Sequence, residues 1–189
     1  MKLHLTILSI IILFASCAPY YYPNTINVPL LNEKGDAQLN IDASTSGFNQ
    51  QLAYAATENI GLMFNSNFSL GNNTNKINNV ESIRNHNFFE FGAGYFTTIK
   101  NDWKFEVYGG GGFGKNQSIP IDNIFFLSDN FDIRHQRYFI QPSFAYATEN
   151  VDVAFSTRFA FLNFKDLKNN LTPSFNQFIE PALTLKFGI

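Results

Sequence analysis

The sequence has few charged residues and a single cysteine. Only 15% of its 189 residues are Asp, Glu, Lys or Arg, well below the quarter that is usual in soluble domains. Cys17 has no second cysteine to pair with, which excludes a disulfide within the chain. The formal net charge is −2, so the basic surface that nucleic-acid phosphates require is missing. We therefore expect no nucleic-acid partner.

Long hydrophobic runs are also missing. No segment reaches the 18 consecutive apolar residues of a transmembrane helix. The longest apolar run, residues 5–14, follows the weakly basic start of Lys2 and His4. Its length and position are those of a signal-peptide core. We expect residues 1–16 to be a signal peptide.

The residues after this run resemble a bacterial lipobox. Ala15 and Ser16 are small and directly precede Cys17. In lipoproteins with this motif, the cysteine becomes the first mature residue and carries acyl chains. The resemblance implies lipidation of Cys17, followed by a periplasmic tether over residues 17–34.

Aromatic residues and a period-two alternation are abundant. Aromatics make up 16% of the chain. In residues 151–161, Val153 and Phe155 alternate with Ala154 and Ser156, which is typical of a strand with one apolar face. The same pattern, less regular at 48–56 and 137–147, predicts eight strands in all. They are 36–44, 48–56, 60–70, 88–97, 103–113, 137–147, 151–161 and 179–187.

The connections between these segments differ in length. Short turns rich in Asn and Asp lie at 57–59, 100–102 and 148–150. Most of the alternate connections are longer and polar: 71–87, 115–134 and 165–176. Short turns on one side and long loops on the other are typical of outer-membrane barrels. This places the N-terminus and the short turns in the periplasm and the longer loops outside the cell.

The composition of the polar face indicates which way the barrel faces. It consists of Gly, Asn, Gln, Ser and isolated charges, whereas a water-facing surface would carry many more Lys and Glu residues. We therefore expect the polar face to line the interior, with its charges paired in a network; a narrow ion path built on the same charges is the alternative. The network residues are Glu90, Lys104, Glu106, Arg137, Arg158, Glu180 and Lys186.

The arrangement resembles the small eight-stranded outer-membrane barrels of the OmpA-like class over roughly residues 35–189. Four aromatic residues fall near the short turns, as in an interfacial girdle, and the last strand, LTLKFGI, is similar to the assembly signal of such barrels. The resemblance implies an all-β fold, an eight-stranded antiparallel up-and-down transmembrane β-barrel. Pro142 and Pro181 interrupt it, and we expect β-bulges there or different strand limits. The four girdle residues are Tyr54, Tyr95, Trp103 and Tyr146.

Two motifs suggest other chemistry. Residues 109–115 (GGGGFGK) have the spacing of a phosphate-binding loop, but Asn116 replaces the required Ser or Thr and no helix follows. His86 and His135, with Ser82 or Ser128 as nucleophile and Asp129 or Asp132 as orienting acid, give the residue types of a lipid A-modifying enzyme. No spacing singles these residues out, and two histidines do not define a metal site.

We therefore expect a non-enzymatic outer-membrane lipoprotein without a cofactor or metal, with a structural role in the envelope or an interaction role of its outer loops. Its expected partners are outer-membrane lipids and the barrel-assembly and lipoprotein-sorting machinery. A periplasmic lipocalin-like barrel that binds a small ligand, with its apolar face inward, is the second hypothesis. A lipid A-modifying enzyme is the third.

Overall fold

A computed structural model describes residues 21, 23–44, 47–69, 73–77, 80–100, 102–120, 131–166 and 174–188. This part of the chain is all-β. Within it, no helix is long and apolar enough to cross a membrane. The strands are β1 (Ala37–Ser44), β2 (Gly47–Ala55), β3 (Ile60–Phe68), β4 (Asn73–Ile77), β5 (Val80–Lys100), β6 (Trp103–Pro120), β7 (Phe131–Ala147), β8 (Val151–Asp166) and β9 (Ser174–Phe187).

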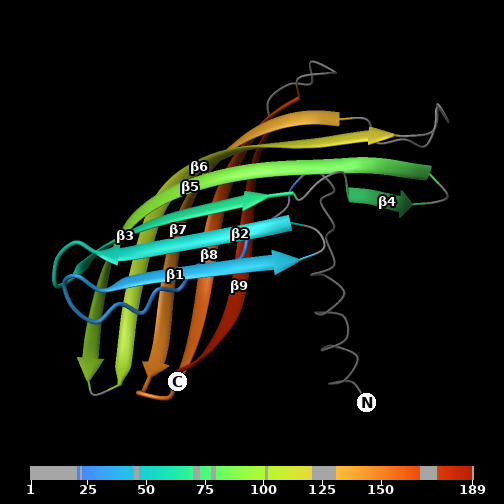
Figure 1. Cartoon of the computed structure of the whole chain (residues 1–189). Coiled ribbons are helices and arrows are strands. Elements are labelled where there is room, and N and C mark those ends of the chain that lie inside the picture. Colours follow the sequence, from blue (N-terminus) through green and yellow to red (C-terminus); the bar gives the residue numbers. More distant parts are fainter. Residues whose placement is uncertain are drawn as a thin grey trace, which may run out of the picture.

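Eight of the strands form one antiparallel up-and-down sheet. The order is β1-β2-β3-β5-β6-β7-β8-β9, so each strand pairs with its neighbour along the chain, and the short β4 pairs only with β5. Figure 1 shows this sheet curling round, with β1 and β9 as its two ends. The predicted eight-stranded, up-and-down barrel fold is confirmed.

The barrel has an open seam between its first and last strands. In the described residues, β1 and β9 do not pair, and no Cα atom of one lies within 8 Å of a Cα atom of the other. The Lys186 ammonium crosses the seam to donate to Gln38 Oε1 at 2.9 Å. The sheet is therefore curled, but the hydrogen-bonded ring is not complete.

Several strands are longer than the alternation predicts. β5 has 21 residues and β6 has 18, so much of what we expected to be long connections at 71–87 and 115–134 is strand instead. The added stretches are polar, for example residues 84–87 (RNHN). A strand without an apolar face has no period-two signal, which is why the sequence pattern ended too early.

The two prolines lie within strands without a bulge, so the expected bulges are wrong. Pairing between β7 and β8 omits Pro142 but keeps its register. β9 pairs through Pro181, opposite Thr157. Because β9 has one unpaired edge, a proline there can be accommodated without the loss of a ladder hydrogen bond.

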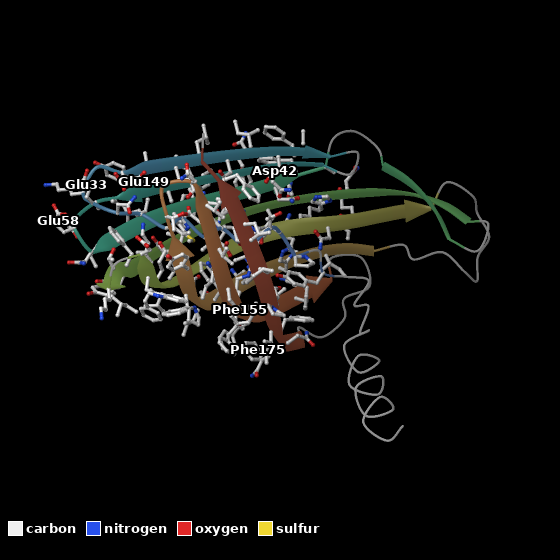
Figure 2. The ribbon with its side chains drawn as sticks, turned by 90° about the horizontal axis from the view of Figure 1, so that it is seen from below. Glu33, Asp42, Glu58, Glu149, Phe155 and Phe175 are labelled. Carbon is white, nitrogen blue, oxygen red and sulfur yellow. The ribbon has the colours of Figure 1, made fainter. Side chains whose placement is uncertain are left out.

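The apolar face of the sheet points outward. On β8, Phe155 is 57% exposed, whereas Ala154 and Ser156 are fully buried. Figure 2 shows Phe155 and Phe175 pointing away from the sheet. A lipocalin-like barrel would have the opposite arrangement. Each of the eight strands contributes a large exposed apolar side chain to this outer surface: Leu39, Leu52, Leu62, Phe91, Phe113, Tyr138, Phe155 and Leu183.

The glycine-rich residues 109–115 belong to strand β6 and do not form a loop. Gly110 faces inward, where an added Cβ would lie 2.1 Å from the carbonyl oxygen of Phe91 and 2.7 Å from the Phe139 ring. At Gly109, the nearest atom to such a Cβ is 3.6 Å away. Gly110 thus allows close approach of backbones that any side chain would prevent.

We predict that Gly110→Ala destabilises the barrel by about 1–3 kcal/mol, the usual cost of overpacking. Gly109→Ala, the matched control on the same strand, should change the free energy of unfolding by less than about 0.5 kcal/mol. Urea unfolding of both variants in detergent micelles measures the difference. Equal stability of the two variants would show that β5 and β6 are not packed so closely at Gly110.

Candidate functional site

The barrel interior is occupied by the chain's own N-terminal segment, here the described residues 21 and 23–31. Residues 24 and 27–31 are buried, although they belong to no strand. At one end, Tyr21 packs against Phe178 with ring centroids 5.1 Å apart. At the other end, Leu31 packs against Ala55 and Phe96, next to the short turns. The sequence predicts a tether over residues 17–34; the described part of this range runs lengthwise through the barrel from the loop end to the turn end.

Four of the predicted network residues meet in one ionic cluster, here called the arginine cluster: Glu90, Arg137, Arg158 and Glu180. Arg137 Nε donates to Glu90 Oε2 at 2.9 Å, and Arg158 Nε donates to Glu180 Oε2 at 2.6 Å. Arg158 also lies 3.8 Å from Glu90, which links the two pairs. Two arginines and two glutamates balance in charge, which offsets part of the cost of burying them.

The N-terminal segment supplies neutral partners to this cluster. Arg137 donates to Tyr21 Oη at 2.5 Å and to Asn24 Oδ1 at 2.6 Å. Arg158 donates to the Asn24 carbonyl at 3.0 Å, and Tyr21 donates to Glu180 Oε1 at 2.8 Å. The guanidinium of Arg137 also lies 4.2 Å from the centroid of the Phe88 ring, a favourable cation–π distance. The two arginines therefore connect the segment to the barrel wall.

Amide side chains continue this contact along the segment. Asn27 donates to Asn65 Oδ1, and Asn65 in turn donates to Glu90 Oε1, both at 2.9 Å. The backbone carbonyls of the segment accept from wall residues as well: Gln51 donates to Thr25 at 2.8 Å and Gln141 to Asn27 at 2.7 Å. These bonds satisfy backbone groups of a segment that belongs to no strand and is buried at residues 24 and 27–31.

The remaining network residues lie nearer the short turns and outside the arginine cluster: Lys104, Glu106 and Lys186. Lys104 donates to the Leu30 carbonyl at 3.0 Å, and Lys186 donates to the Pro29 carbonyl at 3.0 Å. Glu106 is buried two residues along β6 from Lys104. Leu30 has a positive φ of 57°, which few residues other than glycine adopt. The lysines thus hold the segment where its backbone turns sharply.

Sequence reasoning identified the charged wall residues and missed their partners. Tyr21 and Asn24 contact Arg137, which is more than 110 residues away along the chain. Neither residue belongs to a periodic pattern. The one available signal was the set of inward arginines, which required partners in addition to the carboxylates.

The residues proposed for an enzyme do not form a catalytic group in the described part of the chain. Ser128 and Asp129 lie outside the described residues, and so does the side chain of Ser82. His135 is 4% exposed and stacks on Phe88 with centroids 5.4 Å apart. Asp132 forms an ion pair with Lys115 at 3.1 Å. In this arrangement, the His135 ring contributes to packing.

The described residues line a cavity in the seam and another at the loop end. One, of about 560 Å³, lies in the seam; Leu39 and Ile41 of β1 and Leu183 and Leu185 of β9 form its sides, and Ile26 of the N-terminal segment lines it too. The second, of about 210 Å³, lies at the loop end. It is lined by Phe68, Ser69, Asn85, His86, Asn87, Lys115 and Gln117.

Among the described residues, no group of three or more His, Cys, Asp or Glu side chains could hold a metal ion. No protein-family model matches the chain, and comparisons with curated proteins and with solved structures found no match.

Removing Arg137 should strongly destabilise the protein. Arg137→Ala leaves Glu90 with only the more distant Arg158 as its cationic partner, and breaking a buried pair costs about 3–5 kcal/mol. Arg134→Ala is the matched control, because Arg134 lies on the same strand with an exposed side chain and should have an effect below about 0.5 kcal/mol. Urea unfolding in detergent micelles compares the two variants. Equal unfolding free energies would contradict a buried role for Arg137.

Proposed function

We propose that this protein is an outer-membrane lipoprotein whose eight-stranded barrel spans the bilayer. We further propose that it has no enzymatic activity and acts as an envelope component, or through its outer loops. One observation carries the proposal: the barrel is apolar outside and ionic inside. In a protein surrounded by water, this distribution would be reversed.

The outer surface has the features that a bilayer requires. Large apolar side chains with exposed fractions from 37% to 73% occur on all eight strands of the sheet. Tyr54, Tyr95, Trp103 and Tyr146 are exposed near the short turns, where an aromatic girdle would meet the lipid headgroups. An apolar surface of this extent in water would promote aggregation. Outer-membrane lipids are therefore the proposed surroundings.

The filled interior supports a non-conducting role. Eight strands leave little room beyond side chains, and here the N-terminal segment occupies part of that room. The arginine cluster crosses the interior from Glu90 on β5 to Glu180 on β9. Assembly would require the barrel-assembly machinery, and an acylated Cys17 would require the lipoprotein-sorting machinery.

Tryptophan fluorescence in vesicles tests the membrane-spanning proposal. Trp103, the only tryptophan, is first replaced by Phe, and a single tryptophan is then introduced by Phe155→Trp or Phe139→Trp. Phe155 is 57% exposed and Phe139 only 3%. In vesicles of lipids brominated on their acyl chains, fluorescence at position 155 should be strongly quenched and fluorescence at position 139 only weakly. Equal quenching, or failure of the folded protein to enter vesicles, would contradict the proposal.

A further inference from the structure

The direction in which the N-terminal segment runs limits where its lipid anchor can lie relative to the long connections. On β7, Tyr21 contacts Arg137 and approaches His135; these residues lie at the level of Tyr138, or beyond it towards the loops. Among the β7 side chains that the structure describes, which exclude Phe131, Tyr138 is the exposed apolar residue nearest the loop end. On β7, Tyr21 therefore lies at the loop-side border of the apolar outer surface; on β9, the exposed Phe175 lies three residues further towards the loops than Phe178, which Tyr21 contacts.

The other end of the segment lies at the opposite border. The Leu30 carbonyl accepts from Lys104, and Lys104 is next to Trp103, which begins β6 at the short turn. Figure 2 shows Glu33, Glu58 and Glu149 together at this turn end. The segment therefore runs across most of the height of the apolar surface, with Tyr21 as its loop-side end.

The position of Cys17 is limited by the length of chain that connects it to Tyr21. Cys17 lies four positions before Tyr21. A fully extended chain spans at most about 3.3–3.6 Å per residue, or about 14 Å over four positions. The apolar band of an outer-membrane barrel is about 25 Å high. Cys17 therefore cannot reach the membrane border on the side of the short turns.

We propose that the N-terminal segment is threaded through the barrel, so that the acyl chains on Cys17 enter the leaflet on the side of the long connections, the outer leaflet of the outer membrane. This inference rests on the proposed function in two respects: that Cys17 is acylated and that the long connections lie outside the cell. It reverses the periplasmic position of the N-terminus that we expected from the sequence. The protein would then be held in the membrane both by its barrel and by a lipid on the outer side.

The open seam provides a route for this threading. Acyl chains cannot pass through an interior closed by the arginine cluster. Between β1 and β9, however, Thr25, Ile26 and Val28 line the same cavity as the strand edges. A sheet that is still open along this line can receive the segment sideways, before Lys186 bonds to Pro29 and Gln38 across the gap.

Single-cysteine labelling on intact cells tests the threading. The acylated Cys17 has no free thiol, so Pro19→Cys, Asn169→Cys and Glu149→Cys each introduce one reactive site. They report on the N-terminus, the connection between β8 and β9, and a short turn, respectively. With a bulky maleimide that does not cross the outer membrane, positions 19 and 169 should be labelled on intact cells. Position 149 should be labelled only after permeabilisation. A fatty-acid analogue should mark all three variants and not Cys17→Ser.

Two outcomes would overturn the inference. If position 19 is labelled only after permeabilisation, together with position 149, the segment is not threaded. If position 149 is labelled on intact cells and positions 19 and 169 are not, the threading holds but the acyl chains lie in the periplasmic leaflet. Failure of the proposed function itself has a separate signature, which is recovery of the protein in the soluble fraction without a fatty-acid label.

Discussion

The structure depends on the buried guanidinium of Arg137 and on the groups that surround it. A charge with about 1% exposure is stable only when its hydrogen bonds are satisfied. Glu90 supplies the negative charge, and Tyr21 and Asn24 of the N-terminal segment supply neutral acceptors. The segment and the barrel wall therefore need each other: without the segment, both arginines would lose partners, and without the arginines, the segment would lose its strongest attachments.

The open seam gives the segment additional room. The interior of an eight-stranded barrel is just wide enough for side chains or one small ligand, and here a peptide of about ten residues passes through it. In the described residues, the Cα atoms of β1 and β9 are more than 8 Å apart, so the wall curls more widely than a closed ring of eight strands would. Lys186 spans the seam by binding both the segment and Gln38 of β1.

The sequence predicted the strand order and the direction of each face, because burial on one side of a strand imposes a period of two. This rule places Phe155 and Arg158 on opposite faces, and the scarcity of Lys and Glu on the polar face indicates that Arg158 points inward. The limits of β5 and β6 could not be predicted, because their polar ends have no such alternation. The path of residues 23–31 could not be predicted either, since contacts such as Asn24 with Arg137 join residues more than 110 positions apart. Four of the seven predicted network residues meet in the arginine cluster, while Lys104 and Lys186 bind backbone carbonyls.

Amide hydrogen exchange of the protein in lipid bilayers tests most directly whether the interior is organised around the N-terminal segment. Before the amides of Asn27, Val28, Leu30 and Leu31 meet water, contacts of the segment with the wall must break. If opening costs about 3–5 kcal/mol, as for a broken buried pair, exchange should be slowed at least about a hundredfold relative to a free peptide. Exchange at the free-peptide rate, with β7 still protected, would contradict the account, because the segment would then lie outside an intact barrel.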